Sequence, residues 1–504
     1  MTARHILALD AGTSSVRAIV FDDQARILGM AQNEFEQKFP RPGWVEHDPE
    51  EIWTRQLDVM RSAVERSGIE SDGIAGIGIT NQRETVVLWD RATGEPLHDA
   101  IVWQDRRTSE ECESMRAEGR EEFLTRRTGL LFDPYFSGTK LRWLLDNVPG
   151  ARSRAERGEL AAGTIETWLV WKLTGGRLHV SDVSNASRTL LYDIHENDWN
   201  DELLSIFDIP RPVLPEIVPC SLPIGETDVD LLGTSVPVSG MIGDQQSALF
   251  GQLCVEPGMS KTTFGTGCFT LMNTGGEVVH SRNRLLSTVA WRIGDQPVQY
   301  ALEGSVFMAG ASIQWLRDGL GIIDSAPEVN ELAASVPDSG GVQVVPAFTG
   351  LGAPYWDPTA RGAILGLTRG STSAHVARAT LESLALRSSD VLEVMVADGG
   401  LALNTLRVDG GAAASDLLMQ MQADFLDVRV ERPALLESTA LGAAYMAGLG
   451  VGLWSGIDEL ESHRSVERTF TPRIDAATRD ARLVQWKRAV RRSLEWAVEP
   501  GDDS

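Results

Sequence analysis

A chain of 504 residues is too long for one ordinary hydrophobic core, so its length predicts two large domains. Its hydrophobic fraction of 42% excludes a disordered chain, and no segment approaches the roughly 18 apolar residues of a membrane span. The net charge of −25 would repel nucleic acid and anionic membranes, so neither is expected as a partner. Met1 to Asp10 enters an apolar strand without a signal-peptide pattern, so we expect a cytoplasmic protein without membrane insertion.

The first predicted element is a hairpin whose turn is rich in small and hydroxyl residues. Apolar strands over 5–10 and 16–22 flank the turn at 11–15. Glycine lets a backbone approach a phosphate, amides and hydroxyls can bind it, and Asp10 can hold Mg²⁺ through water. The alternative is an ordinary hairpin that ends in a hydroxyl-rich turn, and the residues of the turn alone do not decide between the two.

A helix is predicted to follow from about Asp48 to Gly68. Asp48 can be the N-cap, Pro49 suits the first helical position, and Glu51 would complete a capping box. Apolar side chains repeat at helical spacing from Trp53 to Val64, and buried strands are expected over 74–80 and 85–89. Alternating strands and helices predict an α/β fold.

Two polar segments at strand ends are candidates for substrate binding. Asn81 to Glu84 separates two buried strands, where a turn with a solvated Arg–Glu pair is the commoner outcome. Asp244 follows a strand over 236–242 and precedes a helix expected near Ser247. It is either a helix cap or a general base for a substrate hydroxyl, because α/β folds place chemistry at the carboxyl ends of strands.

The second half of the chain begins like the first. Apolar strands flank the turn Gly265–Gly267, and Arg407 to Ala412 forms another glycine turn. The repetition predicts two similar domains that face a cleft, with a boundary near residue 250. An amphipathic helix is expected over 476–497, with a frayed tail after Pro500. Because the P-loop, the GxGxxG turn and the protein-kinase motifs are absent, phosphate binding would be distributed over several turns.

A series of short motifs between Ile6 and Trp496 resembles the glycerol kinases, which are carbohydrate kinases with the actin-like ATPase fold. The motifs are Gly43–Asp48, Ile79–Thr85, Tyr135–Lys140, Ser184–Thr189, Gly243–Gln246, Phe264–Phe269, Phe307–Trp315, Gly350–Pro358 and Arg407–Gly411. Each motif is short, but the whole set in this order is highly specific.

The resemblance implies a role for each matching residue. The residues that would bind the glycerol hydroxyls are Arg83, Glu84, Tyr135, Asp244 and Gln245, with Trp103 and Phe269 as an apolar wall. ATP would be bound by Thr13, Ser14, Ser15, Arg17, Thr266, Gly310, Gln314, Gly411 and Ser415. Ser415 stands where relatives carry Asn near the adenine, so that contact departs from the family pattern. Asp10 and Asp244 would lie near Mg²⁺, and Asp244 would be the catalytic base.

The implied fold is α/β, with two actin-like (ribonuclease H-like) domains that flank a catalytic cleft. Residues 1–250 would carry most of the glycerol site, and residues 251–504 would carry the nucleotide site. The implied reaction is in-line phosphoryl transfer from ATP to glycerol, which gives sn-glycerol 3-phosphate for glycerol catabolism. The resemblance also implies a homodimer or homotetramer.

Three alternatives are distinguishable. A relative could phosphorylate xylulose, ribulose or gluconate, although Asn81–Glu84 with Tyr135 favours glycerol. An actin- or chaperone-like ATPase would be indifferent to polyols. An inactive relative would lack a catalytic acid, but Asp10 and Asp244 are both present.

Regulation is predicted to depart from some bacterial relatives, which fructose 1,6-bisphosphate inhibits. The corresponding loop, Asp230–Pro237, is short, carries no cation and has Ser235 in place of arginine. Other relatives are activated by phosphorylation of a histidine in this region, but none lies between His195 and His280. We therefore expect both controls to be absent, unless an arginine from elsewhere, such as Arg211, completes a bisphosphate site.

Overall fold

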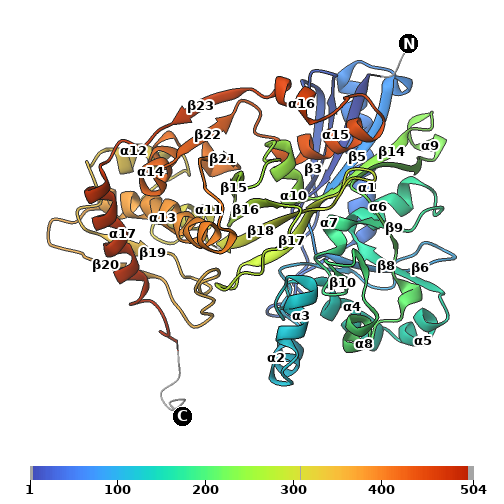
Figure 1. The fold of residues 1–504 in the computed structure, drawn as a ribbon, viewed down its shortest axis with the longest axis horizontal. Helices are drawn as coiled ribbons and strands as arrows, with labels where there is room; N and C mark the ends of the chain where they lie inside the picture. Colours follow the sequence, from blue (N-terminus) through green and yellow to red (C-terminus); the bar gives the residue numbers. More distant parts are fainter. Residues whose placement is uncertain (1–3, 307, 498–504) are drawn as a thin grey trace.

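Two mixed β-sheets organise the molecule (Figure 1). The computed structural model describes residues 4–306 and 308–497, so Phe307 and the tail after Pro500 lie outside the described residues. The first sheet consists of β1 (His5–Ala11), β2 (Ser15–Phe21), β3 (Ile27–Glu34), β5 (Ile74–Asn81), β13 (Ser221–Glu226) and β14 (Pro237–Gly243). The second consists of β15 (Ser260–Phe264), β16 (Cys268–Gly275), β17 (Leu286–Trp291), β18 (Gln299–Val306), β21 (Thr405–Asp409), β22 (Arg429–Pro433) and β23 (Val466–Phe470).

The strand pairing of the first sheet is repeated in the second. In the first, β3 and β1 lie antiparallel on either side of β2, and β1 is parallel to β5, which is parallel to β14. In the second, β18 and β15 flank β16 in the same way, and β15, β21 and β22 run parallel. The predicted α/β class with two similar halves is confirmed, and each glycine turn joins the first two strands of its half.

Helix α1 (Pro49–Ser67) begins and ends where the sequence predicts, but its capping box does not form. The Asp48 carboxylate accepts hydrogen bonds from the amides of Glu50 and Glu51, at 2.9 and 3.3 Å. Glu51 instead accepts one from the amide of Glu36 at 3.2 Å, because β3 ends beside this turn. Gly68 closes the helix in the left-handed conformation at φ 70°.

The first sheet is covered on both faces. Leu7 and Leu9 of β1 point toward α1 and α6 (Ile165–Leu173), whereas Ile6 and Ala8 point toward α10 (Asp244–Gly251) and α15 (Ser438–Gly450). This alternation is the two-residue period of a strand, applied to a sheet that is buried on both sides.

Helix α15 belongs to the C-terminal half of the sequence but packs on the first sheet (Figure 1). It contacts β1, β5, β13 and β14, and it also packs along α10. Gly78 of β5 and Gly240 of β14 make this close approach possible. A Cβ on Gly78 would lie 2.1 Å from the Ala443 carbonyl oxygen, and one on Gly240 would lie 2.5 Å from the Ala447 nitrogen.

The segment between β5 and β14, together with β4, builds a smaller region around a four-stranded sheet. That sheet contains β4 (Glu46–His47), β6 (Val86–Asp90), β7 (Ala100–Ile101) and β8 (Leu160–Thr164). Short pairs are formed by β9 (Val180–Asp182) with β12 (Glu216–Val218) and by β10 (Tyr192–Asp193) with β11 (Asp198–Trp199). The helices here are α2 (Ser109–Ala117), α3 (Glu121–Thr128), α4 (Ser137–Asn147), α5 (Ala151–Glu156), α7 (Val183–Ala186), α8 (Asp201–Phe207) and α9 (Val229–Leu232).

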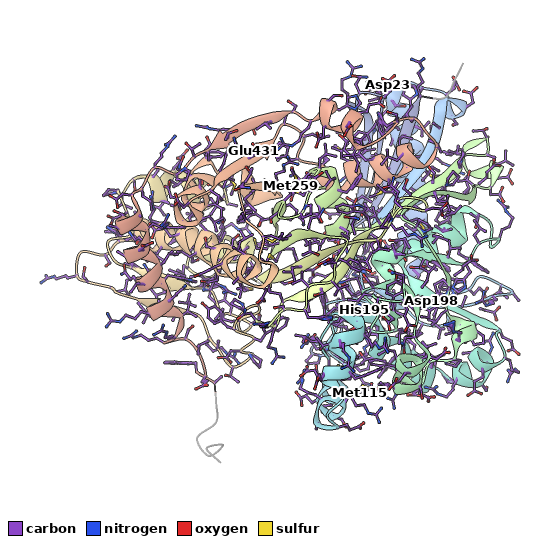
Figure 2. All side chains as sticks on the ribbon, in the orientation of Figure 1. Asp23, Met115, His195, Asp198, Met259 and Glu431 are labelled. Carbon is purple, nitrogen blue, oxygen red and sulfur yellow. The ribbon has the colours of Figure 1, made fainter. Side chains whose placement is uncertain are left out.

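The remaining helices belong to the C-terminal half of the sequence. They are α11 (Gly310–Asp318), α12 (Glu328–Ala334), α13 (Ser373–Gly399), α14 (Asp416–Leu426), α16 (Ile457–His463) and α17 (Ala476–Val490), and β19 (Gln343–Val345) pairs with β20 (Ala363–Leu365). The final helix is shorter than predicted, because turns replace it over 491–497. Met259, labelled in Figure 2, precedes β15 in the region where side chains from both halves meet.

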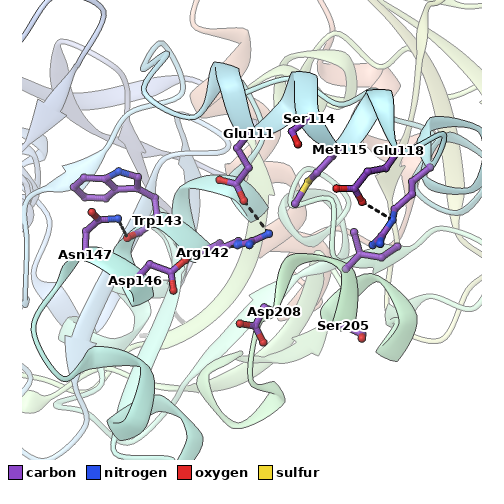
Figure 3. A pocket seen from close by; sticks show the side chains of 12 residues that line it. Glu111, Ser114, Met115, Glu118, Arg142, Trp143, Asp146, Asn147, Ser205 and Asp208 are labelled. Carbon is purple, nitrogen blue, oxygen red and sulfur yellow. Dashed lines mark hydrogen bonds and ion pairs between the residues drawn. The ribbon is translucent and has the colours of Figure 1, made fainter.

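One surface pocket is separate from the predicted site. A pocket of about 590 Å³ lies among α2, α4 and α8, and it is lined by residues such as Glu111, Arg142, Asp146 and Asp208 (Figure 3). None of the predicted site residues lines it.

Within 4–306 and 308–497, no helix has the length and apolar character needed to cross a membrane.

Candidate functional site

The predicted phosphate turn closes the β1–β2 hairpin. The Gly12 amide donates to the Ser15 carbonyl at 3.0 Å, which leaves Thr13 and Ser14 at the tip. Asp10 is half-buried at the end of β1, opposite Arg17 of β2. The Arg17 guanidinium forms an ion pair with Glu437, at the start of α15. Burial raises the pKa of Asp10 to about 7, Arg17 opposes this effect, and Asp244 adds to it.

A buried network holds the carbonyl side of this turn. The side-chain amide of Gln82 donates to the Gly12 carbonyl at 2.9 Å, and the side-chain amide of Gln37 donates to the Thr13 carbonyl at 3.0 Å. His47 lies between the two glutamines, 2.7 Å from the Gln37 Oε1 and 3.4 Å from the Gln82 Nε2. Since Oε1 only accepts, Nε2 of His47 is the donor and Nδ1 is the acceptor. The network fixes the turn from one side and so leaves its tip available for a ligand.

Arg83 and Glu84 are buried, so the solvated-pair interpretation of this segment is wrong. Their exposed fractions are 2% and 1%. Arg83 donates to Glu303 at 2.6 and 3.1 Å, and Arg188 donates to Glu303 at 2.9 Å and to Glu84 at 2.7 Å. The partners come from β18 and from the segment after α7, which the sequence does not place beside this loop.

Charge compensation makes this buried cluster possible. Burial raises the pKa of Glu84, although Arg83 and Arg188 oppose that effect. Burial also acts to raise the pKa of Glu303, but the charges of Arg188 and Arg83 outweigh it and lower that pKa to about 2. Glu303 is therefore ionised at neutral pH and holds both guanidinium groups in place.

Asp244 is the first residue of α10, and Gly243 is the N-cap, so the capping interpretation of Asp244 is wrong. Its carboxylate lies 3.1 Å from the Arg83 Nε and is half-buried. Burial raises the pKa of Asp244, against the opposing charges of Arg83 and Lys261. Lys261 also donates to the Gln245 side chain at 2.6 Å. The helix start thus places a carboxylate and an amide on the same side as Arg83.

Aromatic side chains form a wall beside these polar groups. The Trp103 ring meets the Tyr135 ring edge to face with centroids 5.6 Å apart, and it meets the Phe269 ring at 6.3 Å. The Tyr135 hydroxyl lies 3.4 Å from Arg83. The Trp103 indole donates to the Thr13 hydroxyl at 2.9 Å, so the aromatic wall also contacts the phosphate turn.

The second glycine turn is attached to the start of α11. The amides of Ala309 and Ala311 donate to the Thr266 carbonyl, and the amide of Gly310 donates to the Gly265 carbonyl at 2.9 Å. A Cβ on Gly310 would lie 2.7 Å from that carbonyl oxygen, so glycine is required by this contact. The turn is therefore held from its carbonyl side, as the first turn is.

The remaining predicted nucleotide residues are more dispersed. Gln314 is exposed on α11, and Gly411 is exposed after β21. Ser415 is the N-cap of α14: its hydroxyl accepts from the Leu418 amide at 3.1 Å and bonds to the Asn330 side chain. The hydroxyl of Ser415 is thus used locally, and within residues 4–306 and 308–497 no hydrogen bond joins Gln314 or Ser415 to Arg83, Glu84 or Asp244.

Several residues of the site were not given a role by sequence reasoning. Lys140 and Arg188 lie inside the quoted motifs, and Gln82 and His47 do as well, but their partners are distant in sequence. Glu303 carried one usable signal, because it is the single charged residue of the largely buried strand Gln299–Val306. A fully buried acid requires a partner, but the sequence does not identify that partner as Arg83 or Arg188.

Comparison with known proteins agrees with this architecture. Models of the N-terminal and C-terminal domains of the FGGY family of carbohydrate kinases match residues 5–251 and 261–451. A glycerol kinase of Carboxydothermus hydrogenoformans is 58% identical over 500 residues, which cover 99% of this chain and 100% of the relative.

Solved structures show the same relationship. A Plasmodium falciparum glycerol kinase solved with ADP superposes with a TM-score of 0.93 at 37% identity, covering 98% of this chain and 99% of that one. A gluconate kinase of Lactobacillus acidophilus shares the fold, with a TM-score of 0.87 at 21% identity over 99% of both chains. The chain belongs to the FGGY family of carbohydrate kinases.

Proposed function

We propose that this protein transfers the γ-phosphoryl group of ATP to glycerol and forms sn-glycerol 3-phosphate. The observation that carries the proposal is the convergence of Arg83, Glu84, Tyr135 and Asp244 beside the Trp103–Phe269 wall. These groups suit a small polyol, because charged groups bind its hydroxyls while the aromatic rings contact its carbon chain. The relatives named glycerol kinase support the same substrate.

Asp244 would accept the proton of the terminal hydroxyl. As the proton moves to the carboxylate, the alcohol oxygen forms a bond to the γ-phosphorus and the bond to the leaving ADP oxygen breaks. Burial raises the pKa of Asp244, which makes its carboxylate a stronger base, while the charges of Arg83 and Lys261 oppose the rise. Arg83 at 3.1 Å would also orient the carboxylate toward the substrate.

The backbone turns at Thr13 and Thr266 would bind the phosphoryl oxygens. Both turns are held through carbonyls, those of Gly12 and Thr13 in the first and those of Gly265 and Thr266 in the second, before any ligand binds. Donors fixed before the reaction stabilise the charge of the transition state without reorganisation. Arg17, Ser14 and Ser15 belong to the first turn, and Gly310, Gln314, Gly411 and Ser415 complete the proposed nucleotide site.

Asp10 and Asp244 fit a Mg²⁺ ion that is shared with the nucleotide. Burial raises the pKa of both carboxyl groups, and the charge of Asp244 adds to the rise at Asp10. A cation between them would remove this repulsion. Within the described ranges no group of three or more His, Cys, Asp or Glu residues could hold a metal, so phosphates and water would complete the coordination. Bound Mg²⁺ would neutralise charge on the phosphates.

The setting of the reaction is part of the proposal. We place it in the cytoplasm, where ATP is available, and the four cysteines are buried and free of disulfides. A homodimer or homotetramer is proposed from the family resemblance. The cleft between residues 1–250 and 251–504 would contain both substrates.

A coupled assay of ADP release tests the function. Purified protein with MgATP is given glycerol, xylulose, ribulose or gluconate, or no acceptor. We expect ADP release that depends on glycerol and is at least a hundredfold slower with the other acceptors, which do not match the hydrogen-bonding groups. Preference for another acceptor would change the substrate, and acceptor-independent ADP release would identify an ATPase instead.

A further inference from the structure

Lys140 is a buried lysine for which the proposed reaction has no direct use. It lies on α4, in the hydrophobic core, with an exposed fraction of 0%. Its ammonium group donates to the carbonyls of Glu84 at 3.1 Å, Val102 at 3.3 Å and Tyr135 at 2.8 Å. An ammonium group has three N–H donors, so each one has a partner.

The three carbonyls belong to the loops that carry the proposed polyol site. Glu84 and Tyr135 are polyol residues themselves, and Val102 immediately precedes Trp103 in the aromatic wall. These residues lie in three separate segments: after β5, after β7 and before α4. One side chain therefore holds backbone carbonyls of all three segments at once.

Glu84 has a particular need for this support. Its φ of 62° places a non-glycine residue in the left-handed region. Such a conformation persists when the surrounding structure determines it from several directions. The Glu84 carbonyl accepts from Lys140 and from the Ser137 hydroxyl at 3.1 Å, and its carboxylate accepts from Arg188. Both the backbone and the side chain of Glu84 are thus held before any substrate binds.

Based on the proposed function, we propose that Lys140 is a positioning residue for the polyol site. By holding the carbonyls of Glu84, Val102 and Tyr135, it sets the distance between the Glu84 carboxylate, the Trp103 ring and the Tyr135 hydroxyl. It does not touch the substrate. Its removal should therefore weaken glycerol binding selectively, because the phosphate turns are held by Gln37, Gln82 and the start of α11 instead.

The electrostatic surroundings agree with this role. Among the described residues Lys140 has no carboxylate within ion-pairing distance, so its charge is compensated by the three carbonyl dipoles. Burial lowers the pKa of Lys140 to about 7, while Glu84, Asp105 and Asp133 raise it and Arg106 lowers it. A neutral amine would lose one of the three donors. Retaining such a costly group in the core is consistent with a specific geometric role.

Three variants separate positioning from general stability. Lys140→Met removes the donors but keeps the length of the side chain. Ser137→Ala removes the second donor to the Glu84 carbonyl and leaves the lysine. Leu144→Ala is the matched control, since Leu144 is fully buried on the same helix and makes none of these hydrogen bonds. For each protein, the KM for glycerol, the KM for ATP, kcat and the melting temperature are measured.

We expect Lys140→Met to raise the KM for glycerol about tenfold or more and to change the KM for ATP less than about twofold. Ser137→Ala should raise the KM for glycerol by about threefold. Leu144→Ala should lower the melting temperature while both KM values remain close to wild type. This pattern assigns Lys140 to the polyol site and not to the core alone.

Other outcomes overturn the inference. Equal rises in both KM values for Lys140→Met, or unchanged KM values with a lower melting temperature, would make Lys140 a structural residue. If Lys140→Met does not fold, an unchanged KM for glycerol in Ser137→Ala decides against the inference. Wild-type protein is assayed first, and lack of turnover with glycerol would refute the proposed substrate. In that case the KM values of the variants are measured with the acceptor that the wild-type protein does phosphorylate.

Discussion

At Asp244, burial and nearby charges act on the carboxylate in opposite directions. Burial raises the pKa, and Arg83 and Lys261 counteract it. The carboxylate also lies at the start of α10, where the helix dipole favours a negative charge. These opposing effects act on the same carboxylate that would accept the proton of the substrate. Its proposed catalytic role depends on that balance.

We expect Asp244→Asn to fold and to lose about 10²–10⁴-fold in kcat, because an amide cannot accept the hydroxyl proton. Steady-state ADP release measures the loss, and thermal melting shows whether the fold is intact. Asp72→Asn changes an exposed acid in the same half of the chain and should have wild-type kcat. Near-wild-type turnover by Asp244→Asn would exclude Asp244 as the base.

Sequence reasoning at the residue scale named the candidate ligand-binding groups but not the residues that support them. The motif around Arg83 and Glu84 was identified, yet their burial was not, because burial depends on Glu303 more than 200 positions away. The same applies to Arg188 and Lys140, whose partners lie in other loops. Local patterns indicate which chemistry is present, but long-range contacts determine how that chemistry is held.

The β1–β2 turn is the clearest case at the scale of elements. The sequence predicted its strands and the glycine turn, since both depend on local preferences. It did not predict the Gln37–His47–Gln82 network, which brings together the segment after β3, β4 and the end of β5. The failed capping box of α1 has a similar cause, because Glu51 has a tertiary partner in the amide of Glu36.

The His47 network predicts a dependence of stability on pH. Burial lowers the pKa of His47 to about 4, below its ordinary value of 6.5. Between these values the unfolded chain binds a proton that the folded chain does not, so stability falls as pH decreases from about 6.5 toward 4. At pH 5 the loss is roughly 2 kcal/mol for such a group. Melting temperatures of wild type and His47→Gln at pH 7.5 and 5 should show a smaller loss in the variant.

His179 provides a matched control for this experiment. Burial also lowers its pKa to about 4, but it bonds to Ala162 and Arg91 and not to the phosphate turn. His179→Gln should reduce the pH dependence in the same way without changing the KM for ATP. His47→Gln should raise the KM for ATP as well. The same KM for ATP in both variants would show that His47 does not support nucleotide binding by the phosphate turn.

At the scale of the whole molecule, one buried ion cluster joins the two halves. Glu303 belongs to β18 of the second sheet, and it binds Arg83 from the loop after β5 of the first. Lys261 of β15 contacts Gln245 of α10 across the same boundary. With Asp244, Glu84 and Arg188, the cluster contains three carboxylates and three cations, so its formal charges balance.

Glu303→Gln should lower both stability and affinity for glycerol. It removes the carboxylate that compensates Arg83 and Arg188, and an uncompensated buried charge costs about 3–5 kcal/mol. Melting temperature and the KM for glycerol are the measurements. Glu467→Gln breaks a half-exposed pair with Arg432 and should change neither by much. If the two variants behave alike, the cluster does not hold the polyol site together.

The regulatory expectation also belongs to this scale. Arg211, the proposed substitute donor, bonds to Asp201 and the Trp199 carbonyl, whereas Arg61 of α1 donates to the carbonyls of Leu231 and Asp230. We expect millimolar fructose 1,6-bisphosphate to leave activity unchanged at low enzyme concentration, because the loop itself is acidic. Saturable inhibition would contradict this, and its loss in Arg61→Ala or Arg211→Ala would identify the donor.

The position of α15 has a consequence for the order in which the protein is made. The ribosome synthesises the strands of the first sheet within the first 243 residues, but the helix that packs on them through Gly78 and Gly240 ends at residue 450. Until then, the face formed by Ile6 and Ala8 lacks a major part of its cover. The nascent chain must therefore keep an apolar surface from aggregating while about two hundred further residues are translated. The core of the first sheet is therefore completed by a helix that lies about two hundred residues further along the chain.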